Sequence, residues 1–200
     1  MGGLELIAAV FALGAAAFVV GRKLMSPRAE SQGLLASSTR TSTTATTLEE
    51  TKKLTGKMKY TVYVEKEGIR LSEQGDQLFQ LYQSLMKLLL MKFQPTEITF
   101  ARYEQGIESS CLSISENLMN SKLTLDHLER TKDSAGESWN SQRAQANEAL
   151  DSTGEAITAL GNLFVSLNQI NTQETHRPQL EQSIEQVQEL ARRAKIYSKT

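Results

Sequence analysis

The chain has 200 residues, a formal net charge of −1 and 22% charged side chains. This balance argues against a general nucleic-acid-binding protein, which needs a strongly basic surface. The single cysteine, Cys111, excludes an intramolecular disulfide and is typical of a reducing compartment. Beyond one short apolar segment, the length leaves room for one domain.

An apolar stretch, LELIAAVFALGAAAFVV, occupies residues 4–20 and is interrupted only by Glu5. As a helix it would be roughly 26 Å long, slightly less than a hydrocarbon core of about 30 Å. The positive charges follow the stretch and do not precede it, which favours a retained anchor over a cleaved signal peptide. We therefore predict a transmembrane anchor over residues 1–25 and membrane attachment through residues 4–20.

The charges that flank the anchor predict its orientation. Arg22, Lys23 and Arg28 all lie on its C-terminal side. The positive-inside rule then places the N-terminus outside and residues 22–200 in the cytoplasm, with the reversed orientation as the alternative. Small residues four apart on one helix face allow close helix association, so self-association of the anchor is a second hypothesis. That face carries Ala8, Ala12 and Ala16.

The segment after the anchor is rich in hydroxyl side chains. Residues 36–47 read ASSTRTSTTATT, which has too few apolar groups to bury a core. We predict a disordered, Ser/Thr-rich linker over residues 26–47. A helical domain follows over residues 48–200, beginning at a capping box formed by Thr47 and Glu50.

The first helix of this domain has a poor heptad seam with several polar members. The seam consists of Met58, Val62, Glu65, Ile69, Ser72, Asp76 and Phe79. Gly56, Gly68 and Gly75 weaken the helix, and residues 59–65, KYTVYVE, have high β-propensity. We favour a helix there, with a short strand or a break as the alternative.

A helix apolar on nearly every side follows from Leu85 to Phe93. Such a helix is buried or contacts another apolar surface, and this one is too short and too charged to span a bilayer. We favour burial in the core over a partner-binding or membrane-surface role. The residues concerned are Leu85, Met86, Leu89, Leu90, Met91 and Phe93.

Two long heptad seams follow a break at Pro95, and a turn at residues 131–136 separates them. The first contains Ile107, Cys111, Ile114, Leu118, Ser121, Leu125 and Leu128. The second contains Trp139, Arg143, Ala146, Leu150, Thr153, Ile157, Leu160, Phe164, Leu167 and Asn171. This spacing predicts coiled-coil packing, and the short turn predicts antiparallel neighbours. Cys111 is expected to be a buried, inert thiol.

A shorter terminal helix is predicted from Pro178 onward. Its seam contains Leu180, Ile184, Val187, Ala191 and Ala194. Its end is basic, which complements the helix dipole or binds acidic headgroups or an acidic partner. The basic residues are Arg192, Arg193, Lys195 and Lys199.

Motifs for chemistry are missing from the sequence. Neither His127 nor His176 belongs to a Glu-x-x-His pair, and no paired cysteines, EF-hand or phosphate-binding loop occur. We expect no enzyme activity, cofactor, metal or small-molecule substrate. The predicted fold is all-α: an anchor, a flexible linker and an elongated antiparallel three- to four-helix bundle. The predicted function is a membrane-anchored scaffold or adaptor for other proteins, with a sensor or regulatory module as the alternative.

Overall fold

The computed structural model describes residues 32–132, 136–169 and 177–197, which contain five α-helices and no strand. The helices are α1 (Gln32–Gly56), α2 (Glu65–Lys92), α3 (Ile98–Arg130), α4 (Glu137–Gln169) and α5 (Arg177–Tyr197). A short 3₁₀ helix, η1 (Lys57–Tyr60), follows α1 directly. The prediction of an all-α helical bundle is confirmed, with α1 as an additional member.

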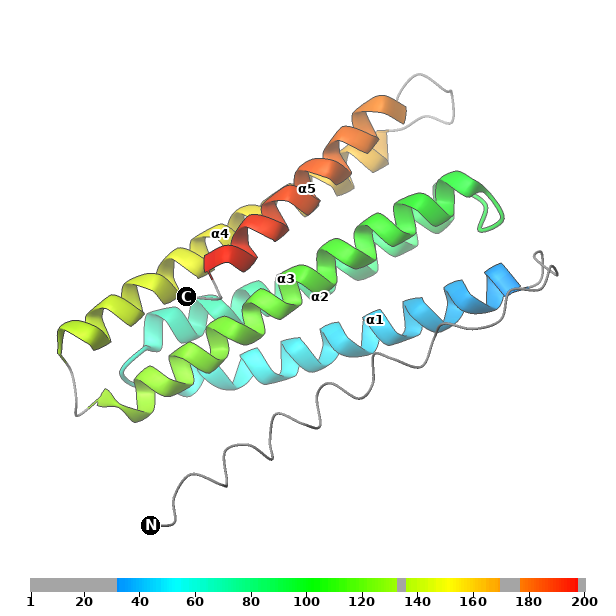
Figure 1. The fold of residues 1–200 in the computed structure, drawn as a ribbon. Coiled ribbons are helices and arrows are strands. Elements are labelled where there is room, and N and C mark those ends of the chain that lie inside the picture. The colour runs from blue at the N-terminus through cyan, green and yellow to red at the C-terminus, as the bar shows by residue number, and fades with distance from the viewer. Residues whose placement is uncertain (1–31, 133–135, 170–176, 198–200) are drawn as a thin grey trace, which may run out of the picture. The chain divides into compact units, whose positions relative to one another are not determined.

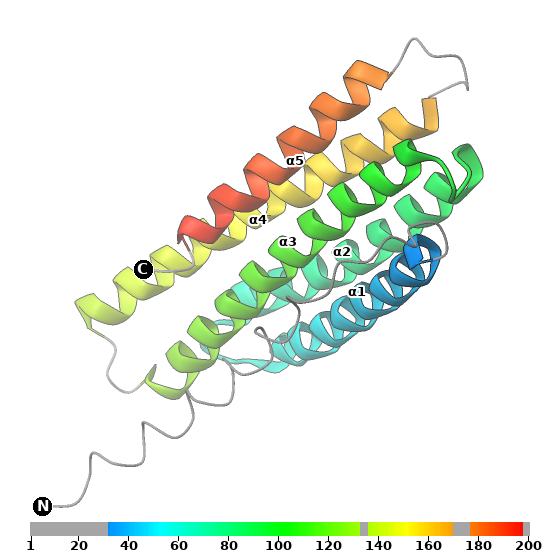
Figure 2. The ribbon, with the colours of Figure 1, turned by 45° about the vertical axis from the view of Figure 1, so that its right-hand side comes forward.

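Successive helices run in opposite directions, as Figures 1 and 2 show. Thr55 of α1 lies against Gly75 of α2, and Met58 lies against Gly68, so these two helices are antiparallel. Near the start of α2, Glu67 bonds to Arg143 of α4, and at its end Lys92 bonds to Asn168 of α4. Both helices therefore run in the same direction. The helices α2, α3 and α4 therefore form the centre of the bundle, with α1 on one side and α5 on the other.

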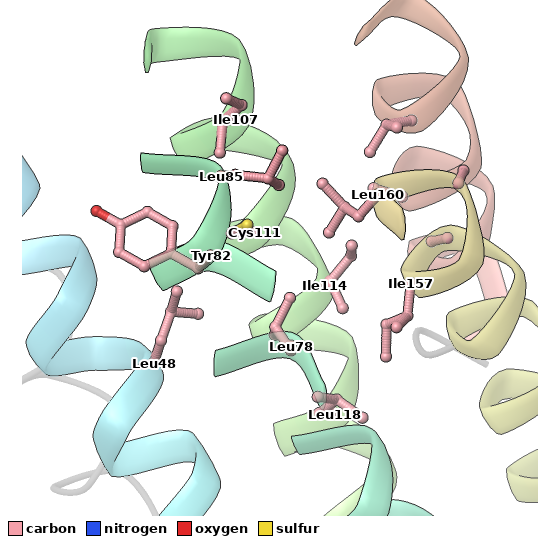
Figure 3. Packing of buried hydrophobic residues seen from close by; sticks show 14 of the residues in the cluster. Leu48, Leu78, Tyr82, Leu85, Ile107, Cys111, Ile114, Leu118, Ile157 and Leu160 are labelled. Carbon is pink, nitrogen blue, oxygen red and sulfur yellow. The ribbon is translucent and has the colours of Figure 1, made fainter. Parts of the chain in front are cut away.

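The core contains the heptad seams predicted for α3, α4 and α5. All seven predicted α3 seam residues are buried, and so are all five of α5. On α4 the seam is buried from Ala146 to Leu160 and again at Leu167, whereas Trp139, Arg143 and Phe164 are partly exposed. Figure 3 shows Ile114 and Leu118 of α3 facing Leu78 of α2 and Ile157 of α4. Asn171 lies outside the described residues.

The predicted linker is wrong for residues 32–47, because they belong to α1. Threonine hydroxyls within this helix donate to carbonyls four residues earlier, as Thr47 Oγ1 does to Thr43 O at 3.0 Å. Such bonds satisfy the hydroxyl without leaving the helix. Thr47 is therefore an interior helical residue and not a helix-starting cap. Thr44, Leu48, Thr51 and Thr55 form the buried seam of α1.

The seam predicted from Met58 to Phe79 is wrong for most of its members, since only Met58 and Ser72 of the seven are buried. Val62 and Ile69 are exposed, whereas the buried α2 face carries Leu71, Leu78, Tyr82, Leu85 and Leu89. The buried face of α2 also carries Gly68 and Gly75, which lie against η1 and α1. A Cβ on Gly75 would lie 2.2 Å from Thr55 Oγ1, and one on Gly68 would lie 2.2 Å from Met58 O. These glycines allow α1 and η1 to pack closely on α2. The stabilisation from this packing outweighs the low helix propensity of glycine.

No helix in the described parts of the chain is both long and apolar enough to cross a bilayer. The predicted anchor at residues 4–20, with Ala8, Ala12 and Ala16, lies outside those parts.

Candidate functional site

The segment made of η1 and its connection to α2 exposes large apolar side chains in a defined conformation. We call residues 57–64 the 57–64 loop. The chain leaves η1 at Thr61, whose backbone is extended, and enters α2 after Val64. The helix favoured for residues 59–65 is wrong, because the chain is not helical between Tyr60 and Glu65. Of the two alternatives, the break is correct and the strand is not. Met58 and Val64 are buried at its two ends and fix it to the bundle.

The middle of this loop is held by the C-terminal end of α3. Both carboxylate oxygens of Glu129 accept backbone hydrogen bonds, one from Val62 N at 3.1 Å and one from Tyr63 N at 2.9 Å. Lys132 Nζ donates to Tyr63 Oη at 3.0 Å and lies 4.3 Å from the centre of that ring. The hydroxyl of Thr61 donates to Met58 O at 2.8 Å. The loop is therefore ordered by specific bonds although it lies at the surface.

Between its two buried ends, the loop directs Tyr60, Val62 and Tyr63 toward solvent. Tyr60 is 85% exposed and Val62 is 73% exposed. Lys57, at the start of the loop, and Lys66, just after its end, are exposed, and Lys59 Nζ is 3.8 Å from Asp76 Oδ2. The result is a small apolar surface bordered mainly by lysines, with the exposed Glu65 as an acidic neighbour of Lys66. Exposed apolar groups held in place at no further ordering cost are typical of protein-binding surfaces.

The apolar residues of the Leu85–Phe93 segment do not form one surface. Leu85, Met86 and Leu89 are buried, as expected for core. Phe93 is partly buried, and its ring lies 5.5 Å from that of Tyr103 in an edge contact. Leu90 and Met91 alone remain exposed, at 55% and 72%. The proposed six-residue interaction surface is therefore reduced to two residues at the end of α2.

The predicted basic contacts near the C-terminus are partly engaged within α5. Arg192 and Arg193 are exposed and both pair with Glu189, Arg193 Nε at 3.0 Å from Glu189 Oε1. Hydrogen bonds from these two guanidinium groups lower the pKa of Glu189. The side chains of Lys195 and Lys199 are outside the described part of the structure.

The titratable groups in the core are not arranged for nucleophilic chemistry. Cys111 is fully buried, and this burial raises the pKa of its thiol, so the thiolate form is disfavoured. Burial and the nearby Glu108 carboxylate also raise the pKa of Tyr82. Among the described residues, no cluster of three or more His, Cys, Asp or Glu side chains could hold a metal ion.

A shallow groove of about 250 Å³ lies between α3 and α5. Arg102 Nη1 bridges it to Glu181 Oε1 at 2.8 Å, and Gly106 forms part of its lining. A Cβ on Gly106 would lie 2.7 Å from Ile184 Cγ2, so the glycine serves the close contact of the two helices. The groove is thus a feature of helix packing.

Comparisons with protein-family models, curated proteins and solved structures find no match for this chain. Functional inference therefore depends on the surface itself. Sequence reasoning did not identify Tyr60, Val62 and Glu129 as parts of one surface. The available signal was the β-prone run KYTVYVE between two helical patterns, which marks a non-helical connection with large apolar side chains.

Proposed function

We propose that this protein is a membrane-anchored, non-catalytic helical adaptor. Residues 4–20 hold it in a bilayer with the N-terminus outside, and residues 22–200 lie in the cytoplasm. The bundle binds another protein through the 57–64 loop. The apolar sequence of the anchor and the three cations behind it support the first part of the proposal.

The observation that carries the adaptor role is the exposure of Tyr60 and Val62 on a loop that Glu129 fixes. Large apolar side chains, tyrosine in particular, contribute most of the binding free energy in many protein interfaces. A loop that is already ordered loses little conformational entropy when it binds. The same exposure without a partner would leave unfavourable apolar surface in water.

The chemistry of the partner follows from the charges near Tyr60 and Val62. Lys57 and Lys66 are exposed, and within the described residues neither is engaged in an ion pair. Complementary charge increases association rates and rejects partners of the same sign. The partner is therefore a protein that presents an acidic surface with an apolar centre.

Site-specific photocrosslinking tests this proposal. A photoreactive amino acid replaces Tyr60 in the full chain, in native membranes, and Gln80 serves as the control because it is exposed in the middle of α2. We expect Tyr60 adducts whose crosslinked peptide is acidic, with a yield that falls after Lys57→Glu and at high salt. Equal adducts from both positions, or adducts insensitive to charge reversal, would contradict the proposal. Adducts composed only of this chain would indicate self-association instead.

A regulatory module is a second candidate, favoured by the seam of α1. Three of its buried residues are threonines, and Thr51 Oγ1 lies 2.7 Å from Ser115 Oγ of α3. A seam of this kind buries little apolar area, so its contribution to stability is small. Displacement of α1 would then be a low-energy transition that couples the anchor to the bundle.

Cys111 reports such a displacement, because it is the sole cysteine of the chain and is fully buried. Leu48 of α1 lies beside Tyr82 in the same region (Figure 3). We expect Leu48→Ala to accelerate thiol labelling of Cys111 by at least about tenfold, since the loss exceeds 1.4 kcal/mol. The helical circular dichroism should be nearly unchanged. Labelling that accelerates only when the whole bundle unfolds would rule out the regulatory module.

A further inference from the structure

The turn between α2 and α3 carries a second group of exposed apolar side chains. Leu90 and Met91 lie in the last turn of α2, and Ile98 begins α3 with 89% of its surface exposed. We call these three residues the α2–α3 tip. The cations Lys87 and Lys92 lie on the last turns of α2, whereas Glu97 Oε1 accepts a hydrogen bond from Gln94 N. The border of the apolar tip therefore carries two lysines and one glutamate, and Lys92 Nζ already donates to Asn168 O at 3.1 Å.

The N-terminal end of α1 lies at the same end of the bundle as this tip. The two helices are antiparallel, with Thr55 opposite Gly75. Because residues in both helices rise equally, counting from that contact toward the tip places residue 38 level with Lys92. The helix begins six residues earlier, at Gln32. Figure 2 shows α1 extending toward the end of the bundle that holds the α2–α3 turn.

The chain before α1 limits how far this end of the bundle can be from the bilayer. This step rests on the proposed anchor at residues 4–20. Eleven residues, 21–31, separate Val20 from Gln32. Even fully extended, they span at most roughly 40 Å. The tip is then at the bilayer-proximal end of the bundle, and the 57–64 loop is at the other end of α2.

We propose that the α2–α3 tip contacts the surface of the bilayer that holds the anchor. Its apolar side chains enter the interface, and the exposed Lys87 beside them contacts anionic headgroups. This contact orients the bundle with its helices directed away from the membrane surface. Since α2 has 28 residues, the 57–64 loop is then presented about 42 Å away from the membrane surface. The α2–α3 tip thus orients the bundle on the membrane, and the 57–64 loop binds the partner protein.

Fluorescence quenching by lipids tests the contact in the full chain. Met91→Cys is labelled with a fluorophore and reconstituted in vesicles of phosphatidylcholine and phosphatidylglycerol that contain a quencher on the acyl chain. The unsubstituted chain, whose one cysteine is the buried Cys111, is the blank for labelling. Gln80→Cys, exposed on the same helix, and Tyr60→Cys, at the opposite end, are the matched controls.

We expect quenching at position 91 to be several times greater than at positions 80 and 60, and to fall when Ile98→Asp is added. Equal quenching at 91 and 80 would overturn the proposal. Protection of position 91 from both the lipid quencher and aqueous iodide would also overturn it, because another protein segment or a second copy then covers the tip. Flotation of the same vesicles separates the two hypotheses. A chain that does not float refutes the anchor and the contact, whereas one that floats with an unquenched tip refutes only the contact.

Discussion

Replacing Gly75 by alanine tests whether α1 packs on α2 as closely as the structure describes. The added Cβ would lie 2.2 Å from Thr55 Oγ1 and 3.6 Å from Lys52 Cα. The Thr55 hydroxyl donates to Thr51 O at 2.9 Å, so rotating it away loses a buried hydrogen bond. Either the hydroxyl or the whole of α1 must move.

The magnitude follows from two opposing effects. Overpacking of this kind costs about 1–3 kcal/mol, and the better helix propensity of alanine offsets about 1 kcal/mol. Gly161→Ala in α4 is the matched control, because nothing lies within 4 Å of the added Cβ. It should stabilise the protein by up to about 1 kcal/mol. We therefore expect Gly75→Ala to be less stable than Gly161→Ala by about 1–3 kcal/mol.

Chemical denaturation of the full chain in mild detergent, followed by circular dichroism, measures both variants. Adding Thr55→Ala to Gly75→Ala removes the overlapping hydroxyl, so the double variant should recover part of the loss. If Gly75→Ala stabilises the protein as much as Gly161→Ala does, α1 does not pack on α2 at this position. The threonine seam would then have no structural role.

Three further outcomes are expected. Glu67→Gln should cost about 2 kcal/mol near pH 7. Burial raises the pKa of Glu67, but hydrogen bonds from Arg143 and Asn147 hold it below its ordinary value. The cost should thus fade as the pH drops through that lowered pKa, which denaturation at a series of successively lower pH values checks. Glu129→Ala should accelerate amide exchange at Val62 and Tyr63 by roughly tenfold, measured by nuclear magnetic resonance, because it removes both acceptors; unchanged exchange would mean that Glu129 does not order the loop. Ser121→Ala should be neutral or stabilising by thermal denaturation, since the buried Ser121 Oγ has no hydrogen-bond partner among the described residues; a large loss would indicate an unseen partner.

The heptad seams of α3, α4 and α5 were predictable because their burial repeats at the period of a packed helix. Ile114 and Leu118, for example, are fully buried where the sequence pattern places them. These seams contain enough apolar residues for periodicity alone to identify the packed face. The helical character of the bundle follows from the same pattern.

The helix α1 was not predictable from composition. Its hydroxyl-rich sequence is also typical of linkers, and composition does not reveal that Thr51 and Thr55 bond to carbonyls of their own helix. The register of α2 failed for a related reason. Gly68 and Gly75 lower helix propensity, but they also allow η1 and α1 to approach α2 closely. This role depends on neighbouring elements that the local sequence does not specify.

The candidate surface was predictable only in part. The β-prone residues 59–65 indicated a possible interruption of the helix, yet the bonds from Glu129 come from a residue 66 positions away from Tyr63. The Leu85–Phe93 segment was correctly favoured as core for Leu85, Met86, Leu88 and Leu89. Its last turn contains the exposed Leu90 and Met91, and the exposed Ile98 follows at the start of α3.

The location of the Tyr60 photocrosslinked adduct tests the anchored-adaptor proposal most directly. Cells expressing the full chain and cells expressing residues 32–200 are irradiated and separated into membrane and soluble fractions. We predict the same partner adduct from both chains, in the carbonate-resistant membrane fraction for the full chain and in the soluble fraction for residues 32–200. An adduct whose location does not depend on residues 1–31, or the absence of an adduct from both chains, would contradict the proposal.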